Sequence, residues 1–98
     1  MTRHWSLSRH ATERGVQMQL DAEEIVRAAD HPEDVYSSKT YPGRTLHRAG
    51  RISVAFSEDG TRIVTILWAN QAEWDKAYAR GVETNRPRRA HYTQAVAA

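Results

Sequence analysis

Alternating apolar and polar positions are clearest in the second half of the chain, where they predict a β-hairpin. Residues 51–57 alternate, and residues 61–69 return with a second strand-like pattern. The Glu58-Asp59-Gly60 sequence between them supplies a short turn, in which Gly60 can adopt a positive φ angle.

Two further strand candidates precede this hairpin. Residues 34–38 and 45–49 are short and strand-like, and a Tyr41-Pro42-Gly43 turn separates them. With the hairpin, they predict a small antiparallel sheet of three or four strands.

The alternation also predicts which side chains face the core. If Ser57 lies opposite Thr61, one face of the hairpin carries Ile52, Val54, Phe56, Val64, Ile66 and Trp68. The same alternation in the preceding strand turns Leu46 inward and places Thr45 and His47 on the open, polar face.

Three helices are expected around this sheet. Residues 8–16 form a short helical segment, and residues 21–30 follow with apolar positions at helical spacing. Residues 70–80 form a terminal helix that Gly81 can close. The pairs Asp21/Glu24 and Asn70/Glu73 match the capping-box pattern at the starts of the second and third helices. The predicted fold is therefore α+β, with N-terminal helices packed on the sheet and a C-terminal helix after it.

Chain length and composition limit the organisation. The 98 residues suffice for one domain, which we place at residues 1–81, and residues 82–98 are expected to be a mobile basic tail. The chain has no cysteine, which excludes disulfides and thiolate chemistry and fits a cytoplasmic location. No apolar run is long enough to cross a membrane, and no histidine pair has metal-ligand spacing, so neither a metal nor a cofactor is expected.

Unbalanced positive charge is concentrated in a local segment and is not spread over the whole chain. Residues 1–80 hold eleven Lys or Arg and eleven Asp or Glu, so this part of the chain is formally neutral. Residues 39–51, with the sequence KTYPGRTLHRAGR, contain four cationic side chains and no acid. Any contact with nucleic acid must therefore use a local patch.

This basic strip has two interpretations. Its cations could bind RNA phosphates through Lys39, Arg44, Arg48 and Arg51. Cleavage would further need proton-transfer groups and a cationic clamp, for which the candidates are His10, Arg14, Tyr41, His47 and Arg51. Alternatively, the arginines guard a sheet edge against aggregation while their heads stay in water.

Two segments resemble a known family. The sequence from His10 to Val16, with the helix and His31-Pro32-Glu33-Asp34-Val35 after it, resembles the opening of a family of small bacterial and phage domains of unknown function. The resemblance covers residues 8–68. That family is similar in fold to the BrnT and RelE-type toxins, which are messenger-cleaving ribonucleases of toxin–antitoxin pairs. The resemblance implies helices on one sheet face, basic residues on the other, and functional roles for His10, Arg14 and Arg51.

Two functions follow as expectations. The first is a toxin-like RNA-binding domain, with metal-independent endoribonuclease activity as its enzymatic form. The second is a non-enzymatic phage or mobile-element protein that binds a partner through the sheet edge or through the helix carrying Trp74 and Tyr78. The candidate partners are RNA, a cognate antitoxin or host protein, and a second copy of the chain.

Overall fold

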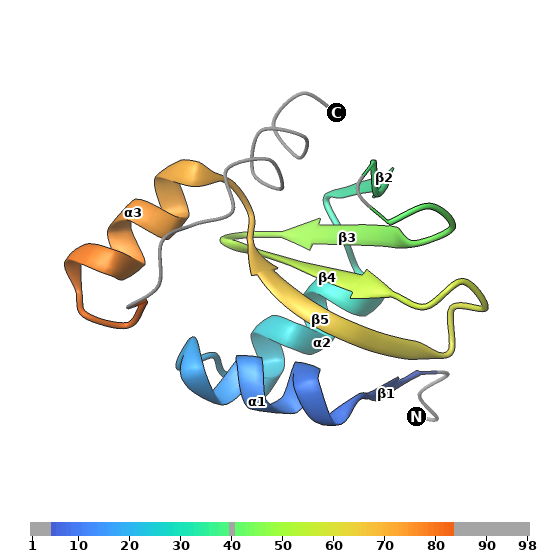
Figure 1. Cartoon of the computed structure of the whole chain (residues 1–98), viewed down its shortest axis with the longest axis horizontal. Coiled ribbons are helices and arrows are strands. Elements are labelled where there is room, and N and C mark those ends of the chain that lie inside the picture. The colour runs from blue at the N-terminus through green and yellow to red at the C-terminus, as the bar shows by residue number, and fades with distance from the viewer. Residues whose placement is uncertain (1–4, 40, 84–98) are drawn as a thin grey trace.

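Five strands and three helices make up the computed structural model, which describes residues 5–39 and 41–83 (Figure 1). The elements in chain order are β1 (Ser6–Leu7), α1 (Arg9–Gln17), α2 (Ala22–Asp30), β2 (Asp34–Ser37), β3 (Thr45–Ala49), β4 (Ile52–Phe56), β5 (Arg62–Trp68) and α3 (Gln71–Ala79). The α+β class predicted from the sequence is confirmed. Among these residues, no helix is both long enough and apolar enough to cross a bilayer.

The sheet differs from the prediction in strand number and direction. Its order is β1-β5-β4-β3-β2, and β1 runs parallel to β5 while the other neighbours are antiparallel. The expected three or four antiparallel strands are thus five strands in a mixed sheet. The additional strand, β1, has only two residues, which is too short to show a period-2 pattern in the sequence.

Local capping fixes where the helices begin. The Ser8 hydroxyl accepts a hydrogen bond from the Ala11 N–H at 3.0 Å, which starts α1 directly after β1. At α2, the Glu24 carboxylate accepts the Asp21 N–H at 3.0 Å, and at α3 the Asn70 side chain accepts the Glu73 N–H at 2.9 Å. The second and third starts are those that the capping patterns predict.

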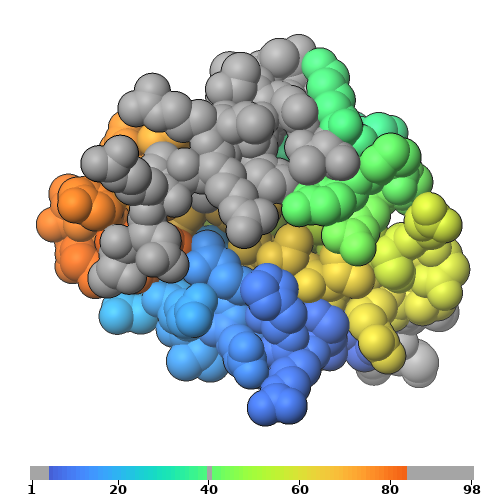
Figure 2. Space-filling view, viewed as in Figure 1, coloured from blue at the N-terminus to red at the C-terminus, as the bar shows by residue number. Residues whose placement is uncertain are grey.

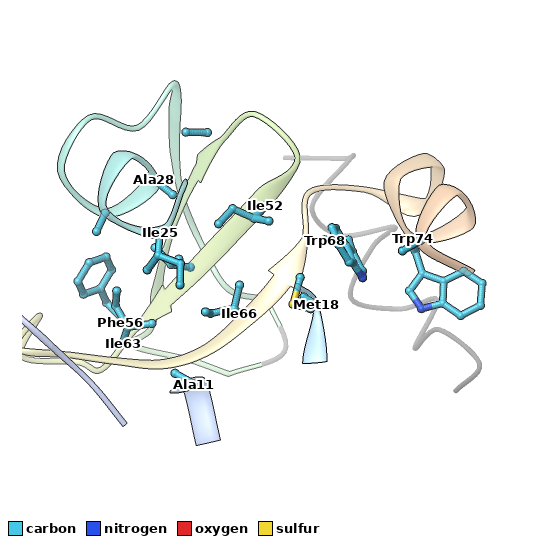
Figure 3. Close-up of a cluster of buried hydrophobic side chains, with 14 residues drawn as sticks. Ala11, Met18, Ile25, Ala28, Ile52, Phe56, Ile63, Ile66, Trp68 and Trp74 are labelled. Atoms are coloured by element: carbon cyan, nitrogen blue, oxygen red, sulfur yellow. The ribbon is translucent and has the colours of Figure 1, made fainter. Parts of the chain in front are cut away.

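The core lies between the helices and one face of the sheet (Figure 3). Ile66 lies in the middle of this cluster and has no solvent exposure. Trp68, which was expected on the core face, and Trp74 fill the end next to α3, and Phe56 and Ile63 fill the other end. The helices therefore cover one sheet face and one sheet end.

The faces of β3 are the reverse of those predicted. Gly50 and Arg51 form a two-residue connection between β3 and β4, so Ala49 pairs with Ile52 and His47 pairs with Val54. His47 consequently shares the core face, whereas Leu46 lies on the opposite face. Successive side chains of a strand point to opposite faces of the sheet. An error of one residue in the assumed length of the connection therefore places every side chain of the strand on the wrong face.

A β-bulge changes the core face of β5. The pairing shifts beside Ala55 and Phe56, so Phe56 lies opposite Ile63 while Ala55 lies opposite Thr65. Ile63 is fully buried and Val64 is only partly buried. The predicted core position at Val64 is therefore wrong, because a bulge inserts one extra residue and alternation cannot show it.

The folded part continues past the expected boundary at residue 81. Gly81 has a φ angle of 78°, which is the left-handed conformation that ends α3. Val82 then packs against the core, and Glu83 is buried. Residues 84–98, the rest of the expected tail, lie outside the described residues.

Candidate nucleic-acid interface

Arg51 binds a carboxylate of the protein itself. Its Nε lies 2.7 Å from Oε1 of Glu24, and one terminal nitrogen lies 3.0 Å from Oε2. This hydrogen bonding holds the pKa of Glu24 below its ordinary value and raises the pKa of Arg51. The Arg51 guanidinium also lies 5.5 Å from the Trp68 ring centroid. Arg51 thereby joins the β3–β4 turn to α2.

Arg48 is neutralised in the same way. Its Nε donates to the Asp34 carboxylate at 3.1 Å, and a terminal nitrogen reaches Glu33 at 3.2 Å. The Asp34 hydrogen bond raises the pKa of Arg48. These contacts tie β3 to the start of β2, and they occupy the donors that a phosphate would need.

Arg14 belongs to a buried network instead of an open face. One terminal nitrogen donates to Oε1 of Glu83 at 2.8 Å, and the Trp68 indole donates to the same oxygen at 2.9 Å. The network connects α1, β5 and the residues after α3. The ion pair with Glu83 explains why an arginine is present at position 14, and no bound ligand is needed to explain it.

The two candidate histidines lie on opposite faces of the sheet. His47 faces the core side, where its Nδ1 lies 3.0 Å from the Ala29 carbonyl oxygen and its ring packs on Phe56. The exposed His10 lies 3.1 Å from the Thr65 hydroxyl, and Thr65 pairs with Ala55 on the other face. They cannot act on the same phosphate from these positions.

The strip itself is divided between two ends of the sheet. Arg44 precedes the five-residue strand β3 and Arg51 follows it, which separates their backbones by roughly 17 Å or more at the usual rise per strand residue. Figure 1 shows the β2–β3 loop at the end of the sheet opposite α3. The predicted catalytic and phosphate-binding residues therefore do not form one site.

An open pocket lies at the loop end of the sheet. It has a volume of about 740 Å³ and is lined by the β2–β3 loop and by the turn between β4 and β5. In Figure 2 the two segments, green and yellow-green, lie beside each other at the right of the molecule. Tyr41, Arg44 and Arg62 are among its lining residues. A volume of this size is in the usual range for small-molecule sites.

The cations of this pocket differ from those at the other end. Arg44 lies 4.9 Å from the Tyr41 ring centroid, so the cation and the aromatic ring are held together. Within residues 5–39 and 41–83, Arg44, Arg62 and the neighbouring exposed Lys39 form no ion pair. No carboxylate of the described residues therefore holds the side-chain donors of these three cations.

Asp59 belongs to the turn that forms one wall of the pocket. Its carboxylate accepts the Thr61 N–H at 3.0 Å and the hydroxyls of Thr61 and Ser57 at 2.7 Å. These hydrogen bonds lower the pKa of Asp59 to about 2. All three hydrogen bonds are accepted by Oδ1, so Asp59 stabilises the turn through that oxygen.

The sequence interpretation named only part of this pocket. Tyr41 and Arg44 were among the expected residues, but Arg62 and Glu58 were treated as parts of a hairpin. The signal for Arg62 is its place directly after the turn, because β3 and β5 both begin at the loop end of the sheet. Among the described residues, no cluster of His, Asp and Glu could hold a metal ion.

No protein-family model, curated protein or solved structure matches the chain. The resemblance of residues 8–68 to toxin-like domains therefore stays a prediction.

The ion pair at Arg51 gives a stability prediction. Arg51→Ala is expected to lower the free energy of unfolding by about 1 kcal/mol, since the pair has two hydrogen bonds but is partly exposed. Urea denaturation measures this change. Arg9→Ala is the control, because its pair with Glu13 is exposed and should contribute less than about 0.5 kcal/mol. An unchanged stability in Arg51→Ala would contradict a structural role.

Proposed function

We propose that this protein is an RNA-binding domain that holds single-stranded RNA at the pocket formed by the β2–β3 loop and the β4–β5 turn. The observation that carries the proposal is the distribution of unpaired cations. Arg14, Arg48 and Arg51 each form an ion pair with a carboxylate, whereas Arg44 and Arg62 line an open pocket and have no such partner among the described residues.

The aromatic ring favours RNA over other polyanions. Tyr41 lies in the same pocket as both arginines, and an aromatic ring beside guanidinium groups suits an unstacked base next to its phosphate. Arg44 and Arg62 would contact phosphate oxygens, and Lys39 would add charge at the rim. The toxin-like resemblance is consistent with an RNA ligand.

Cleavage is not part of this proposal. A ribonuclease that uses no metal needs a base, an acid and a cation around one phosphate. His10 and His47 are on opposite sheet faces, and Arg51 is paired with Glu24 at the far end of the hairpin. Binding without cleavage is the function that this geometry supports best.

A titration of fluorescent single-stranded RNA at two salt concentrations tests the proposal, with RNA length checked on a gel. Binding should weaken with salt while the RNA stays intact. Arg44→Ala and Arg62→Ala should each reduce the salt dependence by about 0.7 in log–log slope, as expected for one lost phosphate contact. Tyr41→Ala should weaken binding by about tenfold.

Arg80→Ala is the matched control, because Arg80 is exposed after α3 and its removal changes the net charge equally. Equal effects of Arg80→Ala and Arg44→Ala would show only general charge attraction. RNA shortening that depends on His10 or His47 would restore the ribonuclease interpretation.

A protein partner is the second candidate, and β2 is the observation that favours it. This strand is at the edge of the sheet, and its Val35 side chain is 58% exposed. An edge strand can add a strand from another protein through backbone hydrogen bonds. Absence of RNA binding at low salt, with a copurifying protein that protects residues 34–37 from hydrogen exchange, would support this candidate instead.

A further inference from the structure

Glu58 has a defined place in the pocket. Gly43 has a φ angle of 84°, and a β-carbon built on it would lie 2.8 Å from both Cγ and Cδ of Glu58. The Glu58 side chain therefore packs directly against the Gly43 backbone, across the junction of the two loops. The φ angle of Gly43 is one that residues with a β-carbon rarely adopt, and a β-carbon there would also require the Glu58 side chain to move.

The Glu58 carboxylate also differs from that of its neighbour. Asp59 accepts three hydrogen bonds inside the turn, whereas Glu58 forms no hydrogen bond or ion pair within the described part of the chain. Neither Glu58 oxygen is thus used by another described residue, and Glu58 lines the same pocket as Arg44 and Arg62.

A carboxylate in an RNA site repels phosphate, so its useful partner is a donor on a base. Guanine alone among the four bases presents two adjacent donors, N1–H and N2–H, that match the two oxygens of a carboxylate. Adenine and cytosine present one amino group beside an acceptor, and uracil presents one N–H between two carbonyls. Each of these three would bring an acceptor toward a carboxylate oxygen.

We infer that the pocket selects guanine, with Glu58 accepting hydrogen bonds from N1–H and N2–H while the arginines contact phosphate. This inference rests on the proposed function, because it assigns a base preference to the same RNA site. Tyr41 supplies the ring against which the base would lie, and the Glu58 side chain lies against the Gly43 backbone in the same pocket.

The experiment uses four seven-nucleotide RNAs, each a uridine tract with G, A, C or U at the centre, titrated against the full chain. The wild-type protein should bind the G-containing RNA about tenfold more tightly than the others, as expected of one good bidentate contact. Glu58→Gln should reduce this preference to less than about twofold, because an amide has one acceptor and one donor.

Two further variants separate base recognition from charge. Glu23→Gln removes the same charge from an exposed position on α2 and should keep the guanine preference. Gly43→Ala keeps the Glu58 carboxylate but displaces it, so the preference should be lost.

The outcomes are distinguishable. Salt-dependent binding of all four RNAs with equal affinity would overturn guanine selection and leave RNA binding intact. A guanine preference that survives both Glu58→Gln and Gly43→Ala would also overturn the inference, since recognition would then lie elsewhere. No binding of any of the four RNAs would overturn the proposed function and, with it, guanine selection.

Discussion

Glu83→Ala is expected to lower the free energy of unfolding by about 3 kcal/mol, which corresponds to a fall in Tm of about 15 °C for a domain of this size. Glu83 is buried, and one of its oxygens accepts hydrogen bonds from Arg14 and from the Trp68 indole. Its removal leaves a partly buried cation and a buried N–H without their acceptor. We take the lower end of the range for a broken buried pair, because the Arg14 side chain is 19% exposed and can reach water.

Two further variants test whether the loss of stability in Glu83→Ala comes from the buried ion pair. Glu83→Gln retains an oxygen for the indole N–H but loses the charge, so its cost should fall between those of the wild-type protein and Glu83→Ala. Glu13→Ala removes a carboxylate from an exposed pair and should cost less than about 0.5 kcal/mol. Thermal and urea denaturation followed by circular dichroism measure all three. A cost below about 0.5 kcal/mol for Glu83→Ala would contradict the network.

This network changes how Arg14 is understood. The family resemblance implies a functional role for Arg14, while the structure gives it a structural one in joining α1 to the residues after α3. Trp68 shares the same acceptor, so the strand that carries it is fixed by the same contact. A loss of activity in an Arg14 variant would therefore have to be separated from a loss of folded protein.

Local signals predicted the helices well. The capping pairs at Asp21 and Asn70 depend on residues three positions apart, and such short-range interactions are visible in the sequence. The strand β1 was not visible, because Ser6 and Leu7 become a strand only by pairing with Arg62 and Ile63. That pairing joins segments more than 50 residues apart.

The candidate site was only partly predictable, because its local signals are visible in the sequence but its contacts between distant segments are not. A basic strip without acids suggests free cations, but the carboxylates that neutralise it come from other parts of the chain. Arg51 pairs with Glu24, which is 27 residues away, and Arg48 pairs with Asp34 across two strands. Among the strip residues that the structure describes, Arg44 and Lys39 form no ion pair with a carboxylate.

The sheet faces could be predicted only where alternation is unbroken. Ile52, Val54 and Phe56 are buried as expected, but Ser53 and Ala55 between them are buried as well, so burial in β4 does not follow the alternation. The two-residue connection at Gly50 and Arg51 reverses β3 relative to the expectation, which moves His47 to the core side. A candidate catalytic residue was thus misplaced by a single step in register.

The bulge in β5 provides the last prediction, which uses two adjacent residues. Ile63→Ala is expected to lower the free energy of unfolding by about 3 to 4 kcal/mol, because Ile63 is fully buried opposite Phe56 and truncation leaves a cavity. Val64→Ala should cost less than about 1 kcal/mol, since Val64 is only partly buried at the bulge. Urea denaturation of both variants measures the difference. Regular alternation from Trp68 backwards would place Val64 in the core and reverse the order of the two costs, so this pair of variants tests the register of β5 directly.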